Sequence, residues 1–270
     1  MDLLKRYEKW QRAAGRSEST RLTSSRVLKH FISSTGADPK DFTAQNAVDF
    51  LASESFSKNT RAAYFWHISS YAKWLILTGQ RTDMPLLGMP RPKVSKRPPR
   101  PVSPDDLAKL LGQAGNARVR MMILLGAFQG LRVHEIAKVH TRDLDMYERS
   151  MEVSGKGGKV ALLPLHDEIL KAMDTMPDKG YWFESSANPG QPIQAGSVSK
   201  AVSKVMRLAG VPGTPHALRH FFGTQLVRSG VNLRVVQELM RHSTVATTEH
   251  YIQVQATEMR TALAELRMAA

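Results

Sequence analysis

A segment near the C-terminus gathers residue types that can act on a phosphate group. It contains His216, Arg219 and His220, followed by His242 and, nine positions later, Tyr251. An arginine offers a planar fork of N–H donors that matches the oxygens of a phosphodiester. A tyrosine hydroxyl is a latent nucleophile with a pKa of about 10, so it needs a base or positive charge nearby before it attacks. Together these residue types indicate phosphoryl-transfer chemistry.

Helices are expected to position these side chains. One should begin near His216, because Pro215 suits a first helical position and Thr214 can cap the free amides. Residues three and four apart share one helix face, so both histidines and the arginine of this helix should lie together. A second helix is expected over about 233–241. A third, short helix from Val245 would carry the tyrosine.

Two further motifs precede this segment. Gly-Leu-Arg-Val-His-Glu occupies 130–135 and Ser-Gly-Lys-Gly-Gly-Lys occupies 154–159. With His-x-x-Arg-His and the later His and Tyr, this ordered set resembles the tyrosine recombinase family, the phage integrases and their relatives. The motifs cover the second part of the chain, whereas the first part resembles the family only in the number and position of its helices.

The resemblance implies a reaction on duplex DNA that passes through a covalent protein–DNA intermediate. Arg132 and Arg219 would bind the non-bridging oxygens of the scissile phosphate. Tyr251 would attack the phosphorus and keep the 3′-phosphate, while Lys156 protonates the leaving 5′-oxygen. Lys159 is the alternative lysine at this hairpin tip. Because the covalent link conserves the bond energy, no ATP or other cofactor is expected.

The family pattern also assigns the histidines and one glutamate. His216 would accept the tyrosine proton, and His242 would hydrogen-bond the phosphate. Glu135 would orient the first arginine, and His220 would brace the active-site helix. The two helix histidines have the spacing of a zinc-binding helix, but Ala217 stands where that motif needs glutamate, so no metal is expected.

Composition favours a polyanionic partner. The 270 residues carry a formal net charge of +14, and the excess is concentrated in the first part, with 18 basic and 8 acidic residues through Val102. There is no cysteine, which excludes disulfides and thiolate metal sites. We find no apolar run long enough for a membrane span and no signal peptide, so a cytoplasmic protein without a membrane partner is expected, in a bacterial host cell or its nucleoid.

Residues 1–88 predict a helical core-site DNA-binding domain. The apolar pattern and turn residues place helices over about 1–14, 19–34, 41–53 and 57–77. The aromatic residues of the last helix are expected to lie mostly in the core. At its start, Lys58, Asn59 and Arg61 are candidate phosphate contacts.

Residues 89–102 predict a linker. Five prolines disfavour helix and sheet there, and five basic residues without an acidic one suit a tether that follows a DNA backbone. Lys93, Lys96 and Arg97 are therefore further DNA-contact candidates.

Residues 103–270 predict a catalytic domain. Its expected elements are a helix capped by Ser103, an apolar helix over 121–128, two strands around a glycine-rich turn, a short buried strand over 181–183, and helices over 197–208 and 257–268. The whole chain is thus expected to be mainly α-helical with a small antiparallel sheet, a two-domain, C-shaped clamp on DNA.

Two positions depart from the family pattern. Arg241 stands where the family usually has glycine, so its side chain is expected to point outward or toward DNA. His134 replaces a small polar residue and has no assigned role.

The biological role has several readings. Integration or excision of a phage or mobile element, by a tetramer and with a possible excision factor, is the leading one. Resolution of chromosome or plasmid dimers, relaxation of supercoils as by a type IB topoisomerase, and non-catalytic DNA binding are the alternatives. The last helix can pack on its own domain or on a neighbouring protomer.

Overall fold

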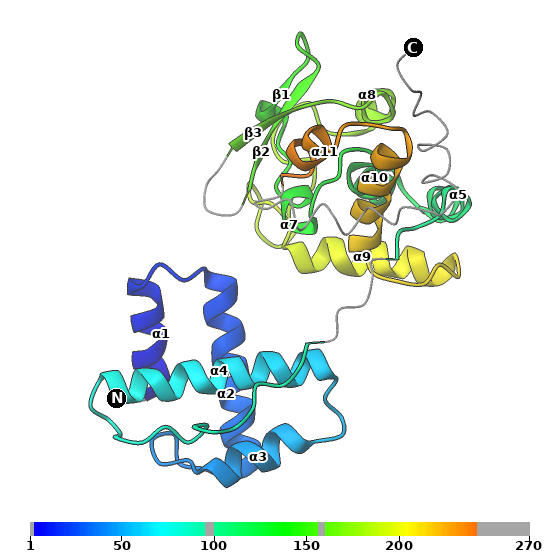
Figure 1. Cartoon of the computed structure of the whole chain (residues 1–270). Coiled ribbons are helices and arrows are strands. Elements are labelled where there is room, and N and C mark those ends of the chain that lie inside the picture. The colour runs from blue at the N-terminus through cyan, green and yellow to red at the C-terminus, as the bar shows by residue number, and fades with distance from the viewer. Residues whose placement is uncertain (1–2, 95–99, 156–159, 242–270) are drawn as a thin grey trace, which may run out of the picture. The chain divides into compact units, whose positions relative to one another are not determined.

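The computed structural model describes residues 3–94, 100–155 and 160–241, and divides the chain into two compact units between Arg97 and Pro98 (Figure 1). The division falls inside the segment expected to be a linker. The fold is mainly helical with a small antiparallel sheet, which confirms the predicted fold class. Among the described residues, no helix has both the length and the apolar character needed to cross a membrane.

In the first unit, hydroxyl side chains cap the starts of α2, α3 and α4. Ser17, Thr43 and Ser57 each accept a hydrogen bond from a backbone amide of the first helical turn. The described helices of this unit are α1 (Leu3–Ala13), α2 (Glu18–Thr35), α3 (Ala44–Ala52) and α4 (Lys58–Leu77).

Aromatic side chains fill the core of this unit. Tyr7 contacts Tyr71 and Trp74, with ring centroids 5.2 Å apart in both pairs. Phe65, Tyr71 and Trp74 of α4 are buried, as expected from the sequence, whereas Trp66 on the same helix is 47% exposed. Large rings therefore supply most of the buried apolar surface that a small helical domain needs.

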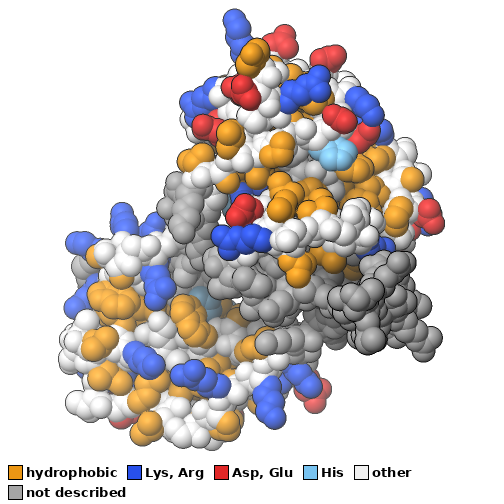
Figure 2. Space-filling view, turned by 45° about the horizontal axis from the view of Figure 1, so that its top comes forward, with side chains coloured by type: hydrophobic (Ala, Val, Ile, Leu, Met, Phe, Trp, Pro, Cys, Tyr) orange, Lys and Arg blue, Asp and Glu red, His pale blue; other side chains and the backbone are white. Residues whose placement is uncertain are grey.

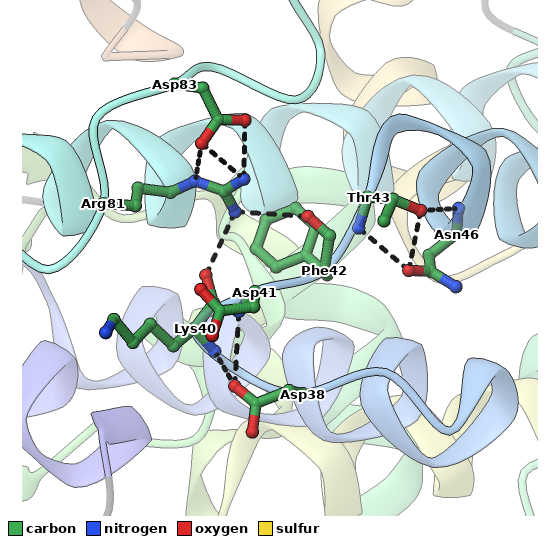
Figure 3. A network of polar contacts seen from close by, with 8 residues as sticks. All are labelled: Asp38, Lys40, Asp41, Phe42, Thr43, Asn46, Arg81 and Asp83. Carbon is green, nitrogen blue, oxygen red and sulfur yellow. Dashed lines mark hydrogen bonds and ion pairs between the residues drawn. The ribbon is translucent and has the colours of Figure 1, made fainter.

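Arg81 ties the segment after α4 to the loop before α3 (Figure 3). Its guanidinium forms an ion pair with Asp83 (2.8 Å) and donates to the carbonyl oxygens of Lys40 (3.1 Å) and Phe42 (3.2 Å). It also lies over the Phe42 ring, 4.9 Å from the centroid. In the same loop, the side chain of Asp38 accepts two backbone hydrogen bonds. One buried cation thus fixes two loops that are far apart in sequence.

The second unit surrounds an apolar helix with a ring of further helices and one sheet. The residues Met121–Ala127 of the central helix are all buried. The main elements described here are α5 (Pro104–Gln113), α6 (Ala117–Phe128), α7 (Val133–Ile136), β1 (Leu144–Asp145), β2 (Ser150–Ser154), β3 (Val160–Pro164), α8 (Asp167–Ala172), α9 (Ala195–Leu208), α10 (His216–Arg228) and α11 (Leu233–Leu239), with short 3-10 turns at Thr141–Asp143 and Met173–Thr175.

The sheet is a short antiparallel meander in the order β1-β2-β3. Met151 pairs with Leu163, and Ser154 pairs with Val160 at the end of the hairpin next to the connecting turn. The predicted strand over 181–183 is wrong. Tyr181 makes only an isolated bridge with His140, and the buried side chains that follow it lie in a turn.

α6 and α10 pack closely at Gly126. At Gly126 an added Cβ would lie 3.1 Å from the Cβ of Leu218, so only glycine leaves ordinary spacing there. α10 begins at His216 as predicted, with Pro215 already in a helical conformation. No side chain caps its first turn, so the cap expected from Thr214 does not form.

Gly130 lies in the loop that connects α6 to α7. It has a φ of +61°, and a Cβ added there would overlap the ring of Phe222. The left-handed conformation costs a non-glycine residue about 1–2 kcal/mol, and overpacking adds about 1–3 kcal/mol. Glycine is therefore required here for two separate reasons.

We predict that Gly130→Ala lowers the free energy of unfolding by about 2–5 kcal/mol, because both penalties apply. Gly210→Ala is the matched control, since Gly210 has a φ of +67° with no atom near the added methyl. Urea unfolding measures both. Equal losses of unfolding free energy in the two variants would show that the close contact with Phe222 adds nothing to the cost of the substitution.

Candidate active site

Three segments of the second unit meet where the sequence places its phosphate-binding residues. They are the loop from Gly130 into α7, the first turns of α10, and the end of α11, coloured green and orange in Figure 1. Arg132 comes from the first segment and Arg219 from the second. The described part of the third segment ends at Arg241.

Arg132 and Glu135 bind each other through both backbone and side chain. Glu135 Oε2 accepts the backbone N–H of Arg132 at 2.7 Å, and Oε1 accepts Nη1 of the same residue at 2.9 Å. The side chain of Glu135 is completely buried, while that of Arg132 is 31% exposed. The carboxylate therefore caps α7 and holds the arginine, whose side chain stays partly exposed.

Arg219 is buried, with 1% of its surface exposed. Its guanidinium donates to the carbonyl oxygens of Gly130 and Met240. A buried guanidinium needs acceptors for its N–H groups, and these two carbonyls come from the loop after α6 and the end of α11. Arg219 therefore links α10 to both neighbouring segments.

Arg241 does not point outward, which was one of its two expected orientations. Its side chain is only 9% exposed and its Nη2 lies 2.7 Å from Oε2 of Glu135. The same nitrogen donates to the carbonyl of Gly130 (3.3 Å), and Nη1 donates to that of Leu239 (3.1 Å). The buried carboxylate of Glu135 attracts the guanidinium strongly enough to hold it inside the protein.

The backbone at Arg241 explains why glycine is usual there in the family pattern. Its φ is +51°, in the left-handed region that costs a non-glycine residue about 1–2 kcal/mol. In the described part of the chain, the only other non-glycine residue with positive φ is Arg149. The sequence shows the unusual arginine, but no local pattern identifies its partner Glu135, which lies 106 positions away.

Burial and the neighbouring charges shift the pKa values of Glu135 and Arg241. Burial alone would raise the pKa of Glu135, but the charge of Arg241 and the hydrogen bonds and charge of Arg132 outweigh it, so this pKa is lowered. Burial lowers the pKa of Arg241, and Glu135 opposes that shift. The carboxylate is therefore ionised and paired at neutral pH.

His216 and His220 lie together on α10, as their spacing predicts. Their ring centroids are 4.4 Å apart in an edge-to-face arrangement. Partial desolvation, with the positive charges of Arg219 and Arg132, lowers the pKa of His216. His216 is therefore neutral at pH 7 and can accept a proton. Within 3–94, 100–155 and 160–241, no group of three or more side chains has the makings of a metal site.

Several of the candidate site residues lie outside the residues that the structure describes. Lys156, His242 and Tyr251 lie outside the described residues, as do Lys96, Arg97 and the predicted helices from 245 and over 257–268. Their flanks are described. Ser154 and Val160 pair at the base of the hairpin that carries Lys156, and Arg241 immediately precedes His242.

The DNA-contact candidates of the first unit also differ among themselves. Lys58, Asn59 and Lys93 are exposed. Arg61 instead donates to the carbonyl oxygens of Leu51 (2.6 Å), Ser53 (3.1 Å) and Phe56 (3.5 Å), so its guanidinium braces the loop before α4. We therefore leave Arg61 out of the proposed DNA surface. Figure 2 shows basic side chains spread over the visible face of this unit, with few acidic ones.

Comparison with known proteins shows the family to which the chain belongs. Residues 102–258 match the model of the phage integrase family. The tyrosine recombinase XerA of Pyrococcus horikoshii is 27% identical, over 99% of this chain and 94% of that protein. A tyrosine recombinase of Pseudothermotoga lettingae is 32% identical, over 69% of this chain and 68% of that protein.

The chain is also similar to solved structures of integrases. The integrase from mycobacterium phage Brujita is 37% identical, with a TM-score of 0.53, over 99% of this chain and 94% of that one. A lambda integrase fragment, solved as a dimer bound to a COC′ core site, has the same fold, with a TM-score of 0.76 at 19% identity, over 99% of this chain and 98% of that one. The chain belongs to the phage integrase family and is a site-specific tyrosine recombinase.

We predict that Glu135→Gln destabilises the protein by about 3 kcal/mol at pH 7, because it removes the charge from a buried pair and leaves Arg241 without its counter-ion. The folded pKa of Glu135 is lowered, so its stabilisation is present above the ordinary value of about 4.3 and is lost as pH falls through the folded pKa. The difference from wild type should therefore shrink in acid.

Urea unfolding at a series of pH values measures this difference. Glu238→Gln is the matched control, because Glu238 forms an exposed pair with Arg234 at 3.1 Å and should change stability by less than about 0.5 kcal/mol. A deficit for Glu135→Gln that stays constant from neutral pH into acid would contradict the assignment of an ionised, paired carboxylate.

Proposed function

We propose that this recombinase cuts and rejoins duplex DNA through a 3′-phosphotyrosyl intermediate on Tyr251. The observation that carries the proposal is the meeting of Arg132 and Arg219 at the end of α11. Arg132 donates to the carbonyl of Arg241 (3.4 Å), and Arg219 donates to that of Met240. Both guanidinium groups are therefore held at the backbone that leads directly into His242.

The chemistry follows from the charges of the reacting phosphate. The Tyr251 oxygen forms a bond to phosphorus, and the bond from phosphorus to the 5′-oxygen breaks. Negative charge that builds up on the non-bridging oxygens is stabilised by Arg132 and Arg219, each worth about 3–4 kcal/mol by analogy with an oxyanion-hole donor. His242 adds a hydrogen bond to the same phosphate.

Two proton transfers complete the first half of the reaction. His216, one turn before Arg219 on α10 and neutral at pH 7, accepts the tyrosine proton. Lys156, in the hairpin between β2 and β3, protonates the leaving 5′-oxygen. A 5′-hydroxyl of another strand then attacks the phosphotyrosyl bond, releases the tyrosine and joins the strands.

DNA binding is proposed from charge and from relatives. The net charge of +14 suits a polyanion, and Lys58, Asn59 and Lys93 offer exposed donors in the first unit. The lambda integrase is solved on a core site, and the Tn1549 integrase is solved with transposon right-end DNA. We infer that residues 1–88 grip one side of a core-type site and that residues 103–270 carry the reaction.

The biological role we propose is integration or excision of a phage or mobile element, by a tetramer on paired sites and with a possible excision factor. The 37% identity to the integrase of phage Brujita supports this choice. Resolution of chromosome or plasmid dimers is the second candidate, supported by the likeness to XerA and XerD proteins.

The test is the covalent adduct itself. We predict that Tyr251→Phe binds core-site DNA as wild type does but forms no adduct on a nicked suicide substrate, because phenylalanine has no nucleophilic oxygen. A denaturing gel separates adduct from free DNA. Tyr147→Phe is the matched control, since Tyr147 is 93% exposed and should keep full adduct yield.

Two outcomes would overturn the proposal. Adduct formation by Tyr251→Phe would assign the nucleophile to another residue. Efficient relaxation of a supercoiled plasmid without cognate sites by the monomer would favour a topoisomerase instead of a recombinase.

A further inference from the structure

The end of α11 is held by three arginines in an unusual pattern. Its last carbonyl groups have no partner within the helix, as at any helix C-terminus. The carbonyl of its last residue and the next two carbonyls along the chain each accept an N–H from a different arginine. The oxygen of Leu239 accepts from Arg241 (3.1 Å), that of Met240 from Arg219, and that of Arg241 from Arg132 (3.4 Å).

Arg241 has an additional contact that connects this helix end to α7. Its Nη2 lies 2.7 Å from Oε2 of Glu135, the same oxygen that accepts the backbone N–H of Arg132. It also shares the carbonyl of Gly130 with Arg219. The side chain of Arg241 therefore contacts one group that holds each of the two arginines, the carboxylate of Glu135 beside Arg132 and the carbonyl of Gly130 beside Arg219.

Removal of Arg241 would change the balance of charge around Glu135. The carboxylate of Glu135 is fully buried, and a buried carboxylate needs a counter-charge. With Arg241 removed, the guanidinium of Arg132 alone would balance that charge. An arginine bound to a carboxylate in this way has less positive charge to offer a phosphate, and the site as a whole loses one positive charge.

We propose that Arg241 is a positioning residue of the recombination reaction. It neutralises Glu135, so that Arg132 keeps its charge for the phosphate. It also fixes the end of α11 and with it the backbone that enters His242. The glycine of the usual family pattern supplies neither function. The inference rests on the proposed reaction, and its test separates failure of the one from failure of the other.

The first experiment compares Arg241→Gly with Arg241→Lys. Glycine suits the left-handed backbone and removes the guanidinium, while lysine keeps the charge but loses the fork of donors. The measured quantities are the single-turnover rate of adduct formation on the nicked substrate, the Kd for that DNA and the melting temperature. Arg149→Gly is the matched control, an exposed arginine with a φ of 47°.

We expect Arg241→Gly to form adduct at least about tenfold more slowly, with a Kd for DNA within about threefold of wild type, because the lost charge acts on the reacting phosphate. Arg241→Lys should recover part of the rate. Arg149→Gly should match wild type in rate. A rate for Arg241→Gly equal to wild type, or a loss explained wholly by weaker DNA binding, would overturn the inference.

A double-variant cycle tests whether Arg241 acts through Glu135. Removing Arg241 should cost less rate in the Glu135→Gln background than in wild type, because no buried negative charge then remains to be balanced. Rates measured below the melting temperature of every variant exclude unfolding as the cause. Additive losses would show that Arg241 does not act through the carboxylate.

The outcomes also distinguish the two proposals. If wild type forms no adduct at all, the proposed reaction fails. If wild type forms adduct through Tyr251 and Arg241→Gly does so equally fast, only the inference about Arg241 fails.

Discussion

One buried carboxylate organises the candidate active site. Glu135 has no exposed side-chain surface and faces the guanidinium groups of Arg132 and Arg241. An ionised carboxylate inside a protein is stable only when charges and hydrogen bonds replace the water it has lost. Both oxygens of Glu135 are satisfied in this way, so its position and those of the two arginines determine one another.

The rest of the second unit serves to bring those partners to the carboxylate. α6 is buried from Met121 to Ala127 and ends at Phe128. Gly130 follows it, and its left-handed conformation turns the chain into α7 without a clash against Phe222. α10 packs on α6 at Gly126, which brings Arg219 to the same loop. Helix packing therefore fixes two arginines from distant parts of the chain at one place, which is what stabilisation of a developing charge requires.

Sequence reasoning predicted most of the elements because their signals are local. Ser103 followed by Pro104 and two aspartates marks the start of α5, and the structure has that cap, with Ser103 accepting the amide of Asp106 at 3.0 Å. Alternating apolar residues around a glycine-rich turn similarly predicted β2 and β3. Such signals depend on residues within a few positions of one another.

The errors concern side chains and segments whose state depends on distant partners. Tyr181 and the two residues after it are apolar enough for a strand, but burial alone does not supply a neighbouring strand to pair with. The side chain of Arg241 was expected to point outward or toward DNA because it replaces a glycine. Its counter-ion, Glu135, cannot be identified from its neighbours in sequence.

The arrangement of the candidate site depends most directly on Glu135 being ionised between two guanidinium groups. Carbon-13 NMR of the glutamate carboxyls measures this, with Glu135→Gln identifying the signal. We predict that the Glu135 signal titrates below the ordinary glutamate pKa of about 4.3, because the arginine charges outweigh the effect of burial. Titration at or above that value would show that the arginines do not pair with the carboxylate, and would contradict the account.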